Sequence, residues 1–224
     1  MHDSCYAANV LPMHVIKNDN LIKAPCLPYV FFLDGLIYIN DDHKSLIKSK
    51  YQINHNIKDL DYLPYLFDIY EEKFVDQLTG WFNILIYDEQ KKSSILLNDR
   101  LGYLPLFYYQ SDSFLIFSSK MESLLNSGLI SNIEVDKVTL AEQLFFNYPL
   151  SDNTYIKGLK TLPDASILSV YKTTVQIQRY WNVDELYQQK ILNKKESIQL
   201  INKSLKNSIN KFLNQVNDKI NFSL

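Results

Sequence analysis

The chain has 224 residues, a formal net charge of −2, and 23 basic against 25 acidic side chains. This length allows one large domain or two small ones, and the balanced charge excludes a broad basic surface for nucleic acid. Two cysteines without a Cys-x-x-Cys spacing, and four scattered histidines, indicate neither a disulfide framework nor a metal site.

The first ten residues, MHDSCYAANV, lack the basic and apolar regions of a signal peptide. The most apolar run, YVFFLDGLIYI, is short and is interrupted by Asp34 and Gly35. This pattern favours a buried strand pair or a bent strand over a membrane helix. The sequence therefore predicts a cytoplasmic protein without a membrane partner.

Residues 27–39 are predicted to form a strand, a turn and a strand, and residues 61–78 carry apolar side chains at helical spacing. Four short apolar runs then alternate with polar turns, at 81–87, 95–98, 106–110 and 114–117. This spacing predicts an antiparallel meander. Because the runs are almost continuously apolar, both faces of the sheet are expected to be covered, by helices on one side and by a second sheet on the other.

Two helices are predicted over residues 118–128 and 134–148, and a closing hairpin over 166–181. Residues 194–216 form an amphipathic helical pattern. Its apolar stripe consists of Ile198, Ile201, Leu205, Ile209, Phe212 and Val216. The strand-like run KINFSL follows, so the sequence predicts a domain boundary near residue 185 and a continuation beyond Leu224.

The segment NDRLGYLPLFYY, residues 98–109, contains the clearest turn signal. Asp99 is expected to open the turn by accepting bonds from its own backbone, and Gly102 can adopt a positive φ. Pro105 presets the entry to the next strand. Arg100 is expected to pair with a neighbouring carboxylate, so all four residues are interpreted as structural.

Several motifs, taken in chain order, resemble the glutamine-amidotransferase half of the asparagine synthetases. They are LTGWFNILIYD, NDRLGYLPLFYY, FSSKMESLL, LKTLPDASIL and the pair Tyr180-Trp181. Upstream, DGLIYIN at 34–40 is similar to that family's Asn-Gly-Glu-Ile-Tyr-Asn segment. The resemblance extends over about residues 30–181.

The resemblance implies an α+β fold, a four-layer αββα antiparallel sandwich of the N-terminal-nucleophile hydrolase type, over residues 1–184. Residues 185–224 resemble the start of an α/β synthetase domain of the ATP-pyrophosphatase type, truncated before the pyrophosphate-binding loop. ATP and Mg²⁺ are implied for that missing domain. No cofactor or metal is expected within the chain itself, whose five glycines are too widely spaced for a phosphate loop.

The expected catalytic residues depart from the family pattern. Family members attack glutamine with a cysteine that follows the initiator methionine and whose free amine relays the proton. Here His2 takes that place, and Cys5 would qualify only after cleavage behind Ser4. The interval between Cys5 and Asp34 is also too short for the family's His-Arg-Gly-Pro-Asp motif.

The resemblance implies that Asp34 and Gly35 correspond to the family's glutamine-binding and oxyanion loop. An ionised Asp34 accepts hydrogen bonds but donates none, so it is expected to weaken stabilisation of an oxyanion. The backbone N–H of Gly35 would then be the donor that remains.

Three functions stay open. The first is the front part of an ATP-dependent amide-forming enzyme that has lost glutaminase activity, acts on a small-molecule or peptide carboxylate and joins a synthetase domain in cis or in trans. The second is an active glutamine-hydrolysing enzyme whose true N-terminal cysteine is missing here or exposed by processing. The third is a non-catalytic module that binds a partner through the apolar stripe of residues 194–216.

Overall fold

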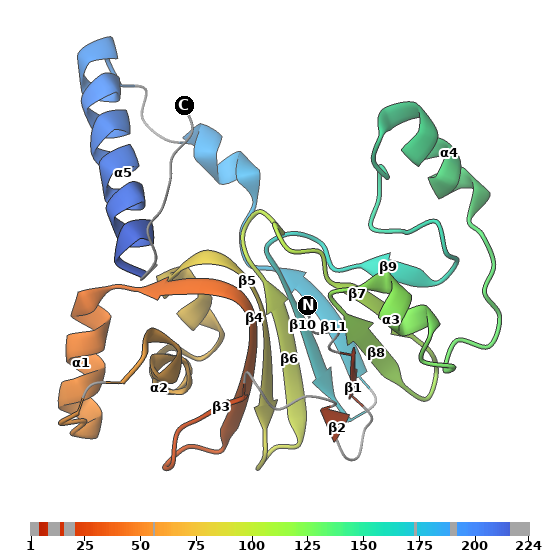
Figure 1. Cartoon of the computed structure of the whole chain (residues 1–224), viewed down its shortest axis with the longest axis horizontal. Helices are drawn as coiled ribbons and strands as arrows, with labels where there is room; N and C mark the ends of the chain where they lie inside the picture. Colours follow the sequence, from red (N-terminus) through yellow and green to blue (C-terminus); the bar gives the residue numbers. More distant parts are fainter. Residues whose placement is uncertain are drawn as a thin grey trace. The chain divides into compact units, whose positions relative to one another are not determined.

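A computed structural model describes residues 5–8, 14–15, 21–55, 57–172, 174–188 and 192–215. Contacts divide the chain into two compact units, residues 1–182 and 183–224, and each is described by itself. Figure 1 shows the arrangement of helices and strands within them.

The first unit contains a six-stranded antiparallel sheet in the order β11-β10-β6-β5-β4-β3. Its strands are β3 (Leu21–Lys23), β4 (Tyr29–Ile39), β5 (Leu78–Asp88), β6 (Ser93–Asn98), β10 (Ser166–Tyr171) and β11 (Thr174–Arg179). The predicted closing hairpin is confirmed as β10 and β11. The turn predicted within residues 27–39 is wrong, because β4 runs unbroken through Gly35 along its partner β5.

A second antiparallel sheet has the order β2-β1-β8-β7-β9. Its strands are β1 (Cys5–Ala8), β2 (His14–Val15), β7 (Phe107–Gln110), β8 (Leu115–Ser118) and β9 (Leu159–Thr161). The predicted single meander over residues 81–117 is therefore wrong. Strands β5 and β6 belong to the first sheet, β7 and β8 belong to the second, and the turn at 99–105 crosses between them.

Three apolar clusters separate four layers. Strand β4 shows how alternation assigns side chains to layers, because Phe31 faces the outer helices and Phe32 faces the second sheet. The cluster between the sheets includes Val30, Phe32, Leu85, Leu96, Leu106, Tyr108, Leu115, Phe117 and Leu168. A further cluster packs Ile116 and Leu159 of the second sheet against Leu124. The predicted α+β four-layer antiparallel sandwich is confirmed (Figure 1).

The outer helices of the six-stranded sheet are α1 (Asp41–Tyr51), α2 (Leu63–Tyr70) and the 3-10 segments η1 (Asp59–Tyr62) and η2 (Glu71–Gln77). The single helix predicted over 61–78 is thus divided, because Glu71 adopts a positive φ of 50° and ends α2. Helix α1 was not predicted. It begins at the cap Asn40, whose side chain accepts from the backbone of Asp42.

Helix α3 (Met121–Leu125) packs on the outer face of the second sheet, whereas α4 (Lys137–Phe146) lies beyond the ends of the strands (Figure 1). Both helices are shorter than predicted. The second unit contains η3 (Val183–Gln188) and α5 (Lys194–Gln215), which confirms the predicted amphipathic helix. The predicted strand KINFSL lies outside the described residues. No helix within the described ranges combines the length and the apolar character that crossing a membrane requires.

Candidate active site

The two sheets are joined at one end by two connections, residues 99–106 from β6 to β7 and 162–165 from β9 to β10. Asn98 holds these connections together from the end of β6. Its Nδ2 donates to the carbonyl oxygens of Leu162 and Pro163 at 3.3 and 2.8 Å, and its Oδ1 accepts from Ser166 N at 2.9 Å. This end of the sandwich is therefore fixed by polar contacts between segments far apart in the sequence.

Asp99 builds the turn that the sequence predicts at 98–105. Its buried carboxylate accepts from the backbone N–H groups of Leu101 and Tyr103 in the turn, at 2.9 and 3.2 Å, and from Phe82 N in β5 at 3.2 Å. Gly102 takes a φ of 56°, in the left-handed region, where a larger residue would be strained. The carboxylate is thus engaged with backbone donors.

Arg100 contacts residues outside the turn. Its guanidinium lies 3.7 Å from a carboxylate oxygen of Asp76 and 5.9 Å from the ring of Trp181. Both Arg100 and Asp76 are about half exposed. Pro105 follows in the connection to β7 and is exposed.

Asp34 and Gly35 lie in the middle of β4, opposite Asn83 and Phe82 of β5. Gly35 has a φ of 114°, and a Cβ placed on it would lie 2.2 Å from the carbonyl oxygen of Trp81. The backbones therefore approach here in a way that only glycine allows. Asp34 is exposed beside this point. The candidate oxyanion pair thus has a defined backbone geometry.

Asn83 is a polar side chain at this site that the sequence reasoning missed. It is 5% exposed, its Nδ2 donates to the carbonyl oxygen of Leu104 at 3.4 Å, and its Oδ1 has no hydrogen-bond partner among the described residues. Asp34, Asn83 and Asn98 form one row across β4, β5 and β6. A lone Asn inside the apolar run WFNILIY was the signal that could have found it.

Cys5 is the first residue of β1, and its Cα is paired with that of Ser118 at the end of β8. Ser118 is in turn paired with Phe107, and Phe107 with Thr161. Phe107 directly follows the 99–106 connection, so this row and the Asp34 row lie at the same joined end of the two sheets. The structure thus places Cys5 and Asp34-Gly35 at one end, although about thirty residues separate them.

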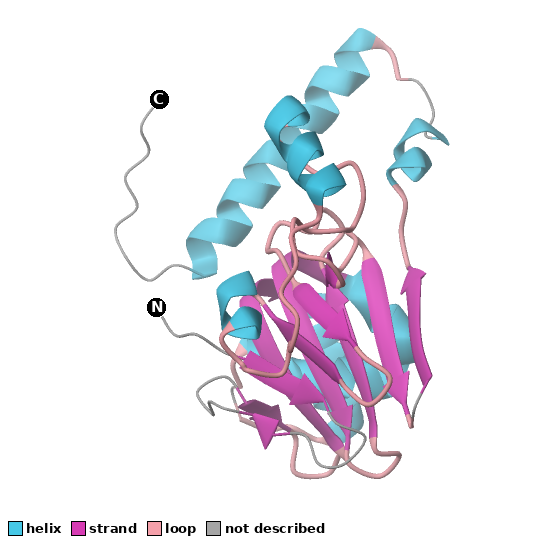
Figure 2. Cartoon of the chain, turned by 90° about the vertical axis from the view of Figure 1, so that its right-hand side faces the viewer, coloured by secondary structure: helices cyan, strands magenta, loops and turns pink. Residues whose placement is uncertain are grey.

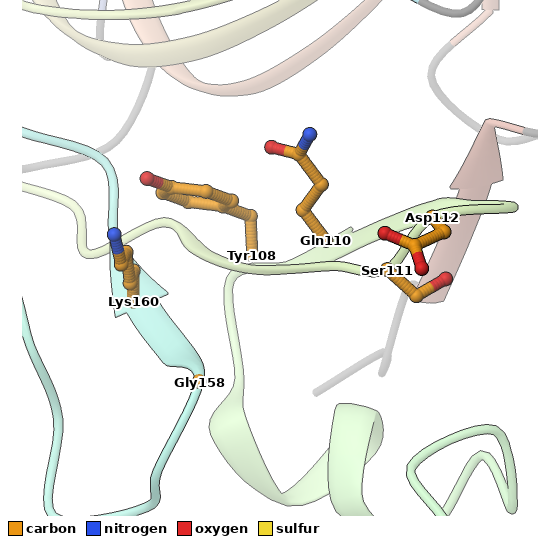
Figure 3. A pocket seen from close by; sticks show the side chains of 6 residues that line it. All are labelled: Tyr108, Gln110, Ser111, Asp112, Gly158 and Lys160. Carbon is orange, nitrogen blue, oxygen red and sulfur yellow. The ribbon is translucent and has the colours of Figure 1, made fainter.

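A separate cavity of about 300 Å³ lies toward the other end of β7. It is lined by Tyr108, Gln110, Ser111, Asp112, Gly158 and Lys160 (Figure 3). Within the described ranges, no three His, Cys, Asp or Glu side chains are grouped closely enough to hold a metal ion. Neither the joined end nor this cavity therefore offers a metal-binding set there.

Comparison with known proteins identifies a family and several relatives. The family "Glutamine amidotransferase domain" matches residues 21–181. Asparagine synthetase 3 of Bacillus subtilis is 28% identical over 157 residues, 70% of this chain and 25% of that protein. Asparagine synthetase 2 of the same organism is 37% identical over 100 residues, 43% of this chain and 13% of that protein. Among solved structures, the glutamine phosphoribosylpyrophosphate amidotransferase of B. subtilis has a TM-score of 0.46 at 10% identity, covering 80% of this chain and 43% of that one.

The antiparallel αββα sandwich is the fold of an N-terminal-nucleophile amidotransferase, and the chain belongs to the glutamine amidotransferase domain family. Within that family it is asparagine synthetase-like. The chain spans a quarter or less of the length of the B. subtilis relatives.

Proposed function

We propose that this chain is the front domain of an asparagine synthetase-like, ATP-dependent amide-forming enzyme, and that it no longer hydrolyses glutamine. The observation that carries the proposal is Asp34, which stands beside Gly35 at the joined end of the sheets. An oxyanion there would meet a carboxylate that cannot donate a hydrogen bond when ionised. Loss of one oxyanion donor costs roughly 100- to 1000-fold in rate in other hydrolases.

The position of Cys5 supports the same conclusion. It begins a strand at the joined end, which suits a nucleophile, but four residues precede it in this sequence. Its nitrogen is then part of an amide and cannot relay a proton as a free amine does. Glutamine hydrolysis is expected only if Cys5 has a free amine and Asp34 is replaced by a hydrogen-bond donor.

A partner domain is the second part of the proposal. Helix α4 is capped by Asp136, yet its apolar side chains stand in solvent, with Leu144 75% and Phe145 84% exposed. Figures 1 and 2 show α4 beyond the ends of the strands. In the second unit, α5 exposes Ile201 and Leu205. Apolar surface of this kind is typical of a protein interface and supports a synthetase domain in cis or in trans as the partner.

The amide-forming chemistry would take place in that synthetase domain. We assign ATP and Mg²⁺ to that synthetase domain, because the asparagine synthetase relatives extend well beyond the part matched by this chain. There a small-molecule or peptide carboxylate would be adenylated with release of pyrophosphate, and an amine would then displace AMP. The cytoplasmic location stays a prediction.

Glutamate release from glutamine tests the loss of hydrolysis. Four proteins are compared: the whole chain, its Cys5→Ala variant, a form cleaved to begin at Cys5, and that cleaved form carrying Asp34→Asn. We expect no activity from the whole chain above Cys5→Ala, and little from the cleaved form. An increase in glutamate release by the cleaved Asp34→Asn form would show that the blocked Cys5 amine and Asp34 together account for the loss of hydrolysis. Glutamate release by the whole chain that disappears in Cys5→Ala would overturn the proposal, and release by the cleaved form alone would favour processing.

A further inference from the structure

Polar side chains line the cavity on β7. The structure records no hydrogen bond or ion pair between the side chain of Tyr108, Gln110, Asp112 or Lys160 and any described residue. Tyr108 and Gln110 are two residues apart on β7, and Lys160 is opposite Tyr108 on β9. Figure 3 shows the Tyr108 hydroxyl, the Gln110 amide and the Lys160 amine directed to the same side of the strands.

Tyr108 is the buried member of this group. Its side chain is 6% exposed and its ring belongs to the apolar cluster between the sheets, while its hydroxyl reaches the cavity. Burial, and secondarily the negative charge of Asp152, raise the pKa of Tyr108 above its usual value. The hydroxyl therefore stays protonated at neutral pH and can donate a hydrogen bond. The hydroxyl is open to the cavity and bonds no described residue, so a ligand oxygen can accept from it.

The charges around the cavity restrict what such a ligand can be. Lys160 supplies one positive charge, and together with the Tyr108 hydroxyl and the Gln110 amide it offers converging donors for a carboxylate. Asp112 lines the same cavity with a negative charge, and Asp152 lies close enough to act on Tyr108. A dianion would be repelled by these two carboxylates. A molecule with a carboxylate and an ammonium group can instead pair its negative charge with Lys160 and its positive charge with Asp112.

We propose that this cavity binds a small zwitterionic amino acid, with its carboxylate toward Lys160, Tyr108 and Gln110 and its ammonium group toward Asp112. The volume of about 300 Å³ is at the lower end for small-molecule sites and fits a compact ligand. The lining begins at Tyr108 and Lys160, one position beyond the Cys5 row, and extends to Asp112 past the other end of β7. It shares no lining residue with the candidate active site, and the proposal does not depend on the loss of glutamine hydrolysis.

The test is a titration of the whole chain with each of the twenty amino acids, followed by amide resonances and calorimetry. Propionate and inorganic phosphate serve as comparison anions. We expect at least one amino acid to give saturable shifts at Ser111 and Gly158, with propionate and phosphate at least tenfold weaker. Lys160→Gln should weaken binding at least tenfold and Tyr108→Phe severalfold. The matched control Lys137→Gln, an exposed lysine on α4, should leave binding unchanged.

The proposal fails if no amino acid saturates these resonances, or if Lys160→Gln binds as well as the native chain. Phosphate binding as tight as that of the best amino acid would also overturn it, because the zwitterion would then have no advantage. If Tyr108→Phe does not fold, Gln110→Ala replaces it, since Gln110 is exposed and its loss should still weaken binding.

Discussion

Replacing Asn98 by alanine should separate the two connections that join the sheets. The side chain is 1% exposed and makes three hydrogen bonds, to the carbonyl oxygens of Leu162 and Pro163 and from Ser166 N. Alanine removes all three and leaves the N–H of Ser166, a fully buried residue, without an acceptor. A net contribution of about 1 kcal/mol per bond, plus about 1–3 kcal/mol for a buried unsatisfied group, gives a loss of about 4–6 kcal/mol.

Urea unfolding followed by tryptophan fluorescence measures this loss, because the chain contains Trp81 and Trp181 as reporters. A loss of that size also lowers Tm by about 10–20 °C in a chain of this length. Asn132→Ala is the matched control, since Asn132 is exposed, and it should change the free energy of unfolding by less than about 0.5 kcal/mol. A loss below about 1 kcal/mol for Asn98→Ala would refute the reasoning, because the three bonds would then not secure the joined end.

Gly35→Ala should lower the free energy of unfolding by about 3 kcal/mol or more, or prevent folding, because its Cβ would lie 2.2 Å from the Trp81 carbonyl oxygen. Gly128→Ala should lower it by about 1 kcal/mol, since a Cβ there meets no atom within 4 Å and only the positive φ is unfavourable. Equal urea midpoints for the two variants would contradict this. Burial, followed by the charge of Asp99, raises the pKa of Tyr180. Its contribution to stability is then fully present below about pH 10 and is lost as pH rises, since only the unfolded chain ionises there, so Tyr180→Phe should flatten the alkaline fall in Tm. Arg100→Ala should cost less than about 1 kcal/mol because its ion pair is half exposed, and a larger loss in urea unfolding would show a buried role.

The sequence by itself determined the features that depend on residues close together in the chain, namely turns, helices and hairpins. Turn residues such as Asp99 and Gly102 act within a few positions, so their pattern predicted a turn that the structure contains. Periodicity predicted helix α5 and the hairpin of β10 and β11, because helical and strand patterns depend on residues that are close together in the sequence. The ordered motifs also indicated the family, which the match over residues 21–181 shows.

Only the tertiary structure decided which strands belong together. The runs at 81–98 and 106–117 look alike in sequence, yet the first joins one sheet and the second joins the other. Strand pairing depends on partners far along the chain, such as β10 beside β6, and these partners leave no local signal. The same holds for Asn83, whose burial comes from two neighbouring strands, and for the cavity of Tyr108 and Lys160, which lie 52 positions apart and meet only because β7 pairs with β9.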